Sequence, residues 1–321
     1  MNKFLNEKRE KYYHRQIIKA IGLENTPIAF GAEKKCHIFK NFVVFSHHIG
    51  TFDDKTMSDF ILNLLVKFQN TQYLANYGIT TPRILDIELN DDCIYEIQER
   101  APGQVLSYTN ESNIFNVFGE RQKGFTGLSD MSDTLRADLI SRVLTYNFNM
   151  QKKMKSAPIA HFVDFIRSFK DIQEYGLDLD IHGENFLYDP IKGFSFIDLP
   201  STQSTSKKKF TAQNLDSGTM IFNNRKIKNL ARYRKISDFY VAKQVCGLFG
   251  FFLKYCNYSF DLDLVKQMKK NNYSLFKNKL FPAIKDAGFN LSNDEWNNLA
   301  IYASKFANKE IKLDNSIITT L

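Results

Sequence analysis

The chain has 321 residues, 43% of them hydrophobic and 24% charged, a balance typical of a globular protein with a sizeable core and not of a disordered or fibrous chain. The length suggests two structural units, and the 29 phenylalanines predict an aromatic-rich core rather than a surface for stacking bases. The formal net charge is +8, and its distribution along the chain argues against a polycationic ligand.

Residues 1–24 are predicted to form a charged helical extension, followed by a unit of strands around one helix. Short apolar, β-branched and aromatic runs are typical of strands. Such runs occur at residues 28–32, 36–39, 42–46, 83–88 and 93–98. Gly31 lies at the turn between the first two strands, and the polar residues 90–92 predict a hairpin turn between the last two.

One helix is predicted between the third and fourth of these strands. Ser58 is placed to cap its N-terminus through a side-chain oxygen. Apolar residues then recur at the spacing of a single helical face: Phe60, Ile61, Leu64, Leu65 and Phe68. We expect this face to belong to the core.

A second clear helix is predicted to begin near Ser132, after a stretch at residues 107–131 that is rich in Ser, Asn and Gly and reads as loop with a short helix. Apolar residues mark one face of this helix: Leu135, Leu139, Ile140, Val143 and Leu144. A helix of this length can serve as a rigid base for the loop that follows it in the chain.

The most informative stretch is Asp180-Ile181-His182-Gly183-Glu184-Asn185, with Asp198 downstream. Residues 189–193 predict the turn of a hairpin, so that Asn185 enters one short strand and Asp198 leaves the next, which brings the amide and the carboxylate close together. Mg²⁺ prefers oxygen ligands and takes one or two carboxylates together with substrate phosphates. Asn185 and Asp198 suit that demand and leave Asp180 to orient a nucleophile. The alternative is two ordinary surface turns, which Asp and Asn also favour.

This hexapeptide resembles the Asp-x-His-x-x-Asn catalytic loop of the aminoglycoside phosphotransferase and choline kinase branch of the protein-kinase-like fold, and residues 196–199 resemble the metal-binding segment that follows it. Upstream, residues 77–85 resemble the passage from the family's third helix into its fourth strand. Residues 97–106, with their Pro-Gly pair, resemble the fifth strand and the hinge. The four segments occur in the family's order.

The resemblance implies an α+β, two-lobed protein-kinase-like fold, with a strand-rich N-lobe at residues 25–98 and a mainly helical C-lobe at residues 99–321. It implies ATP and Mg²⁺ as cofactors. Asp180 and His182 would be catalytic: Asp180 would orient the attacking hydroxyl or accept its proton, whereas His182 could equally pin the loop backbone. Asn185 and Asp198 would be the metal ligands.

The same resemblance assigns the nucleotide to two further places. The backbone around Glu99, Arg100 and Ala101 would meet the adenine ring, and the turn at Gly31 would cover the phosphates. The family's third strand carries a Lys or Arg for the α- and β-phosphates, but here Ser46 or His47 falls near that place. In the family this cation pairs with a Glu on the following helix, but the plausible helix positions here hold Lys67, Gln69 and Gln72. The phosphate-binding cation could be relocated to Lys34, Lys35 or Lys40, and the sequence does not select one of them.

Residues 199–236 read as a basic insert in the position of an activation segment. From residue 206 to 236 there are nine basic residues and one acidic residue, a net charge of +8 that equals the net charge of the whole chain. The segment could dock an anionic substrate or nucleic-acid phosphates, or be a solvated lysine-rich loop. Aminoglycosides are polycations, so antibiotic phosphorylation is disfavoured. No Ala-Pro-Glu closes the segment, which departs from ordinary protein kinases.

The sequence therefore predicts an ATP- and Mg²⁺-dependent phosphotransferase that moves the γ-phosphate to a hydroxyl of a small molecule or a protein, and the basic insert is compatible with an anionic acceptor. A protein Ser/Thr kinase of the bacterial effector or toxin type is the alternative, supported by the Ser/Thr-rich residues 201–206. A third hypothesis is a pseudokinase whose basic insert binds a partner. A nucleic-acid partner is compatible with the insert but not favoured.

The remaining sequence signals concern the C-terminal part and the cellular compartment. The chain is predicted to be helical from residue 237 onward, with Ser292 and Glu295 as a capping box. No apolar stretch reaches bilayer length, and the charged residues 1–15 lack a signal-peptide core, so we expect a cytoplasmic protein without a membrane span. Reduced thiols are expected, because the four cysteines lack paired spacing: Cys36, Cys93, Cys246 and Cys256.

Overall fold

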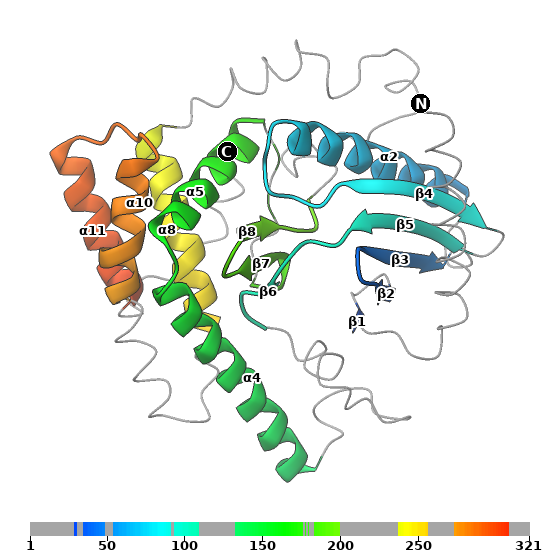
Figure 1. Ribbon diagram of the computed structural model, residues 1–321, viewed down its shortest axis with the longest axis horizontal. Helices are drawn as coiled ribbons and strands as arrows, with labels where there is room; N and C mark the ends of the chain where they lie inside the picture. Colours follow the sequence, from blue (N-terminus) through cyan, green and yellow to red (C-terminus); the bar gives the residue numbers. More distant parts are fainter. Residues whose placement is uncertain are drawn as a thin grey trace.

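A computed structural model describes ten parts of the chain: residues 29–30, 35–48, 54–90, 93–108, 132–175, 177, 179, 183–199, 237–255 and 273–307. Several predictions lie outside these residues: the extension at 1–24, Gly31, Asp180, His182, the basic residues 200–236, and Cys256. The described parts form a mixed fold, with an antiparallel sheet in the N-terminal part and a helical C-terminal part (Figure 1).

The N-terminal sheet has five antiparallel strands in the order β1-β2-β3-β5-β4. Their bounds are β1 Ala29–Phe30, β2 Lys35–Ile38, β3 Phe42–His48, β4 Ile84–Asn90 and β5 Cys93–Glu99. The five predicted strands are thus confirmed, including the hairpin of β4 and β5, which pairs Asn90 with Cys93. Strand β5 lies between β3 and β4, and its side chains from Cys93 to Gln98 are buried on both faces.

Helix α2 (Asp54–Asn76) packs against β4 and follows the sheet in Figure 1. It begins one turn earlier than predicted, so Ser58 is an exposed residue within the helix and not its N-cap. The predicted core face is also wrong at Leu65, which is 39% exposed. Buried residues instead recur at spacings of three and four: Leu64, Lys67, Thr71 and Leu74. Contact with the sheet selects this face, which includes polar residues that an apolar pattern passes over.

Within the described residues, the C-terminal part combines a second, three-stranded sheet with six helical elements and the short 3-10 turn η3 (Gly183–Asn185). The strands are β6 Gln104–Val105, β7 Phe186–Asp189 and β8 Gly193–Phe196, in the order β6-β7-β8. The helical elements are α4 Asp133–Lys155, α5 Ile159–Tyr175, α8 Asp238–Tyr255, the π-helical turn Phe276–Leu280, α10 Phe281–Asp286 and α11 Asn293–Ala307. In Figure 1 the small sheet lies between the five-stranded sheet and these helices.

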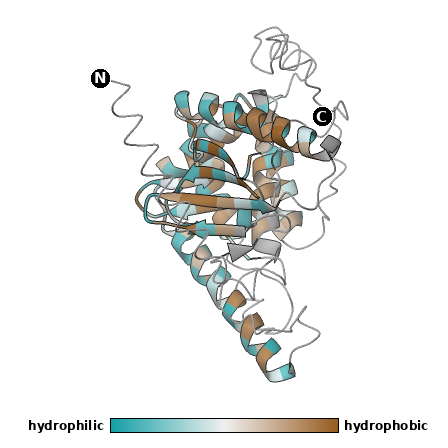
Figure 2. Cartoon of the chain, turned by 90° about the vertical axis from the view of Figure 1, so that its right-hand side faces the viewer, coloured by the Kyte–Doolittle hydropathy of each residue, from teal (hydrophilic) through white to brown (hydrophobic). Residues whose placement is uncertain are grey.

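Two predicted helix starts are confirmed by their caps. The Leu135 amide donates to Ser132 Oγ at 3.4 Å, at the N-terminus of α4. At the start of α11, the Glu295 amide donates to Ser292 Oγ at 3.3 Å while the Ser292 amide donates to Glu295 Oε2 at 2.8 Å, the reciprocal pair of a capping box. Along α4, hydrophobic and hydrophilic residues alternate as expected of a helix that buries one face (Figure 2).

The predicted phenylalanine-rich core is confirmed around α5. Phe165 is its centre: its ring stacks on Phe196 of β8 at 5.0 Å between centroids and meets Phe249 of α8 edge-on at 5.1 Å. Each such pair adds about 0.5–1.5 kcal/mol beyond burial of the same area. All four residues of β8 are buried, so aromatic packing holds the hairpin of β7 and β8 in place and with it the residues at its ends.

The apolar stretch at residues 245–253 belongs to α8, where Val245, Leu248 and Phe249 are buried. Within the parts of the chain that the structure describes, no helix is long and apolar enough to cross a bilayer. Cys36, Cys93 and Cys246 are present as thiols, and burial raises the pKa of the Cys246 thiol.

Candidate functional site

The predicted hairpin is confirmed and places Asn185 and Asp198 at its open end. Strands β7 and β8 pair from Phe186↔Phe196 to Asp189↔Gly193. One step further, the Ile197 amide donates to the Asn185 carbonyl at 2.9 Å, so the residues that flank the two strands remain side by side. Asn185 is buried, at 8% exposure, whereas the Asp198 side chain is 43% exposed.

Asp198 has an unusual backbone. Its φ is +56°, the one positive value of a non-glycine residue in the described parts of the chain. Asp tolerates this left-handed conformation better than most residues, but it still costs free energy, and such residues cluster at functional sites. Its neighbours explain the turn: Phe196 and Leu199 are both buried, at 1% and 2% exposure, and anchor the chain on either side of Asp198.

Gly183 allows the turn at residues 183–185, directly before β7, to lie against Leu106 and Ser107. A Cβ on Gly183 would come within 1.8 Å of Ser107 Oγ and 2.7 Å of the Ser107 carbonyl oxygen. The Leu106 amide donates to the Gly183 carbonyl at 3.1 Å. Asn147 of α4 then holds the next residue by two hydrogen bonds to its backbone, Tyr108 N–H to Oδ1 at 3.0 Å and Nδ2 to Tyr108 O at 3.1 Å. The loop that ends at Asn185 thus has a rigid support.

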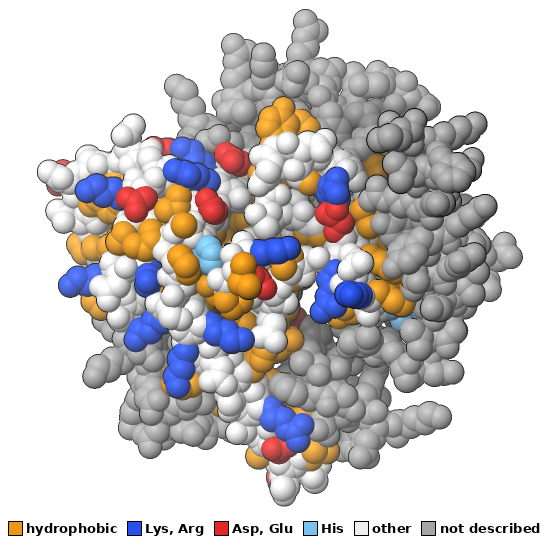
Figure 3. Space-filling model, viewed as in Figure 1, with side chains coloured by type: hydrophobic (Ala, Val, Ile, Leu, Met, Phe, Trp, Pro, Cys, Tyr) orange, Lys and Arg blue, Asp and Glu red, His pale blue; other side chains and the backbone are white. Residues whose placement is uncertain are grey.

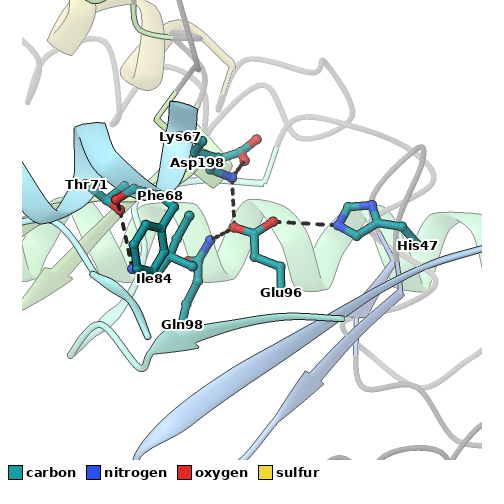
Figure 4. Close-up of polar contacts among 8 residues, drawn as sticks. All are labelled: His47, Lys67, Phe68, Thr71, Ile84, Glu96, Gln98 and Asp198. Carbon is teal, nitrogen blue, oxygen red and sulfur yellow. Dashed lines mark hydrogen bonds and ion pairs between the residues drawn. The ribbon is translucent and has the colours of Figure 1, made fainter. Parts of the chain in front are cut away.

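A buried ion cluster joins helix α2, strand β5 and the end of the hairpin (Figure 4). The Lys67 ammonium lies 3.1 Å from Asp198 Oδ1 and 3.2 Å from Glu96 Oε1. Gln98 donates a hydrogen bond to the same Glu96 oxygen, and His47 Nε2 lies 3.6 Å from Glu96 Oε2. The side chains of Lys67 and Glu96 are 11% and 1% exposed. Burial by itself lowers the pKa of Lys67, but the charges and hydrogen bonds of Glu96 and Asp198 outweigh it and raise that pKa, so the lysine is charged at neutral pH.

Lys67 is the residue that sequence analysis missed as a cation. Strand β3 carries Ser46 and His47, both buried, where a cation was expected. Register pairs Phe45 with Glu96, so Phe45 and His47 share the face of the sheet that meets α2. The apolar pattern of the sequence contains no signal for this cation, because the buried stripe of Leu64, Lys67 and Thr71 is selected by contact with the sheet. Once buried there, a lysine needs a partner.

The three cations that the sequence proposed for the phosphates differ from Lys67 in their positions. Lys40 is exposed in the turn between β2 and β3, next to Phe39 and Asn41. Both neighbours accept hydrogen bonds from Arg100, from its side chain at 3.2 Å and from its amide at 3.1 Å, which places this turn beside the hinge. Lys35 belongs to β2, and Lys34 lies outside the described residues.

The hinge positions predicted to meet adenine follow directly after β5. The Glu99 amide donates to the Arg83 carbonyl at 2.8 Å, and the Arg100 amide donates to the Asn41 carbonyl at 3.1 Å. The Glu99 carboxylate also accepts from Arg83 Nε at 3.0 Å. Two of the three predicted backbone donors are therefore used within the sheet, and Ala101 follows them at the start of the connection to β6.

The donor set at the hairpin end suits a hard cation. The described residues contain no group of three or more His, Cys, Asp or Glu side chains that could hold a metal by themselves. Asn185 and Asp198 contribute one amide oxygen and one carboxylate. Mg²⁺ usually binds through one or two carboxylates together with substrate phosphates, so a site of this composition would need a phosphate ligand to complete it.

Comparisons with known proteins were made for the sequence and for the structure. No family model and no curated protein matches the sequence. Solved structures with some similarity include WbdD in complex with the kinase inhibitor LY294002, at 12% identity and a TM-score of 0.34, covering 90% of this chain and 48% of that chain. A second is a structure of the bifunctional kinase-methyltransferase WbdD, at 12% identity and a TM-score of 0.33, with the same coverage. The chain spans about half the length of those chains, and similarity at this level does not establish a shared activity.

Proposed function

We propose that this protein is an ATP- and Mg²⁺-dependent phosphotransferase with a kinase-like division into an N-lobe at residues 25–98 and a C-lobe at residues 99–321. The observation that carries the proposal is the end of the β7–β8 hairpin. There a buried Asn185 precedes β7, a partly exposed, backbone-strained Asp198 follows the adjacent β8, and a lysine from another part of the chain contacts the aspartate. An amide, a carboxylate and an ammonium together form a set suited to a metal-bound polyphosphate.

Phosphoryl transfer requires little covalent chemistry from the protein, because positioning and charge neutralisation supply most of the catalysis. In the proposal Asn185 and Asp198 would hold Mg²⁺, and the ion would supply charge neutralisation at the phosphates. Asp180 orients the attacking hydroxyl or accepts its proton, and His182 supports the loop that carries Asp180. Gly183 keeps this loop close to the segment after the hinge, because a side chain at that position would collide with Ser107.

The hydrogen bonds of the hinge refine the nucleotide site. The amides of Glu99 and Arg100 already donate within the sheet, so the proposal assigns the donor for the adenine ring to the Ala101 amide and the acceptors to the carbonyls of the same segment. The turn at Gly31 covers the phosphates in this arrangement, as the sequence resemblance implies.

The acceptor is proposed to be a hydroxyl of a small molecule or of a protein, with anionic acceptors favoured. Basic side chains on the face shown in Figure 3 are spread over the surface rather than gathered in one patch. The concentration of basic charge in the sequence is at residues 206–236, which lie outside the described residues. A protein Ser/Thr kinase remains the runner-up because this segment follows a Ser/Thr-rich run.

The test changes Asp198→Asn, which keeps the size of the side chain and tolerates a left-handed backbone but removes the charge. Calorimetric titration should show at least a tenfold loss of Mg-ATP affinity in this variant. Asp180→Ala should retain Mg-ATP affinity within about twofold and lose ATP turnover, since positioned acid–base groups contribute about 10²–10⁴-fold in rate. Asp238→Asn, at a lysine-paired aspartate in the helical part, is the matched control and should change neither quantity.

Equal Mg-ATP affinity in the wild type and in Asp198→Asn would remove the metal assignment. Metal-dependent ATP binding by the wild type without turnover, across panels of small-molecule hydroxyls and protein substrates, would favour the pseudokinase. Turnover with proteins alone would favour the Ser/Thr kinase.

A further inference from the structure

We infer that Lys67 is the cation that contacts the nucleotide phosphates, supplied here by helix α2 instead of strand β3, and that Glu96 is the residue that positions it. The inference rests on the proposed function, because it names the phosphate-binding group of the same site. It also resolves the choice among Lys34, Lys35 and Lys40 that the sequence left open.

The geometry places the ammonium beside the carboxylate assigned to the metal. Lys67 Nζ is 3.1 Å from Asp198 Oδ1 and 3.2 Å from Glu96 Oε1. An ammonium has three N–H donors, and these two contacts use two of them. A triphosphate held by a cation on Asp198 must lie next to that carboxylate, and therefore next to the lysine, which can donate to a phosphate oxygen as a point charge.

Lys67 is held on a firm scaffold. Two neighbours on α2 fasten the helix to β4: Thr71 Oγ1 accepts from the Ile84 amide at 3.4 Å, and Gln72 Nε2 donates to the Ile84 carbonyl at 2.6 Å. Glu96 in turn receives a hydrogen bond from Gln98 and lies near His47. Figure 4 shows these groups converging on one side of the sheet. A charge held in place before the ligand arrives loses little conformational freedom on binding.

A purely structural role would not require the second contact. Glu96 lies on the sheet that α2 covers, and it alone could neutralise a buried lysine. The ammonium also reaches Asp198, 131 positions away in the sequence, on a side chain that is 43% exposed and on a strained backbone. Two carboxylates, Glu96 and Asp198, thus lie against the one Lys67 ammonium. A divalent cation on Asp198 would bring phosphate oxygens within reach of the third N–H donor of the ammonium.

The experiment compares ligands with and without phosphates. The test variant is Lys67→Met/Glu96→Gln, which removes both buried charges together and avoids leaving Glu96 unpaired. Lys170→Met is the matched control, because Lys170 of α5 also pairs with an aspartate at 3.1 Å, but that aspartate is Asp238 of α8, in the helical part of the protein. Binding of adenosine, of ATP with EDTA and of ATP with Mg²⁺ is measured by calorimetry for each protein, with thermal unfolding to verify that each is folded.

The double variant should bind adenosine within about twofold of the wild type and ATP about ten- to hundredfold more weakly, both with Mg²⁺ and with EDTA, the range expected for a lost hydrogen bond to a charged group. The Lys170→Met protein should match the wild type for all three ligands.

Three results would overturn the inference. Equal ATP affinity in the double variant and the wild type means that another group holds the phosphates. A loss confined to the Mg²⁺ arm means that Lys67 acts only through Asp198. A parallel loss of adenosine affinity means that the cluster shapes the whole site rather than contacting phosphate. Absence of ATP binding by the wild type itself would instead remove the proposed function, and the inference with it.

Discussion

Two lysine–aspartate pairs in this protein have the same length and different surroundings. Lys67–Asp198 at the hairpin and Lys170–Asp238 in the helical part both show 3.1 Å between Nζ and Oδ1. The Lys170 side chain is 27% exposed, and its ammonium lies 4.8 Å from the centroid of the Phe289 ring. Asp238 also accepts from the Asn290 amide at 2.8 Å, so this pair ties α5 and the start of α8 to the segment before α11.

The Lys67–Asp198 pair differs from the Lys170–Asp238 pair in the partners of its lysine and in the backbone of its aspartate. Its lysine is shared with a second carboxylate, Glu96, that is almost fully buried, and its aspartate has a left-handed backbone. A strained aspartate and a second, buried carboxylate are costs that a tie between helices does not need. Contact distance therefore does not distinguish the two pairs. The charges and backbone around the pair do.

The largest expected effect on stability comes from breaking the Lys67 cluster on one side. Lys67→Met leaves Glu96 buried without its cation and should lower the free energy of unfolding by about 3–5 kcal/mol. The double variant Lys67→Met/Glu96→Gln should recover most of this loss, whereas Lys170→Met, at a more exposed pair, should lose about 1 kcal/mol or less. Urea unfolding at neutral pH measures all three. If Lys67→Met lowered the free energy of unfolding by no more than Lys170→Met does, the two pairs would not differ as the comparison claims.

Two glycines sharpen the same contrast. A Cβ on Gly183 would come within 1.8 Å of Ser107 Oγ, and a Cβ on Gly250 of α8 within 1.9 Å of the Phe306 ring. Gly183→Ala and Gly250→Ala should each lower the free energy of unfolding by about 1–3 kcal/mol, the usual cost of overpacking. Only Gly183→Ala should also reduce ATP turnover, because it displaces the loop that carries Asp180. If the two variants showed equal ATP turnover at a temperature where both are folded, Gly183 would have no role at the candidate site.

The smallest effect expected is a pH dependence at the structural pair. Burial raises the pKa of Asp238, but hydrogen bonds from the Asn290 amide and Lys170, with the lysine charge, outweigh it, so the folded-state pKa lies below its usual range. A lowered pKa means that the stabilising contribution is present above the unfolded-state pKa of about 3.9 and is lost as the pH falls through the folded-state value. Asp238→Asn should therefore cost about 1 kcal/mol or less at pH 7 and less than that near pH 3.

Unfolding curves of the wild type and Asp238→Asn at both pH values measure this difference. A constant gap between the two proteins would show that the carboxylate charge contributes nothing to the tie. Lys170→Met, measured under the same conditions, removes the other partner of the pair. Its difference from the wild type in free energy of unfolding should also be smaller near pH 3 than at pH 7.

Local chemistry explains what could be predicted from the sequence. The turn at residues 189–193 predicted the β7–β8 hairpin, and the caps at Ser132 and Ser292 predicted the starts of α4 and α11. These signals depend on residues that are close in the chain, where the backbone geometry of a turn or a cap is set by the side chains present. The abundance of phenylalanine likewise predicted the aromatic core, because rings of that number must be buried.

The sequence by itself thus determined the five strands of the N-terminal sheet, the hairpin that carries Asn185 and Asp198, and the starts of α4 and α11. Only the tertiary structure decided where α2 begins, which moved the start away from Ser58, and which face of α2 is buried, which left Leu65 exposed. It also decided that Lys67 meets Glu96 and Asp198. The reason is physical: the environment of a buried charge is set by segments far apart in the chain, here a helix, a strand and a hairpin that meet only after folding.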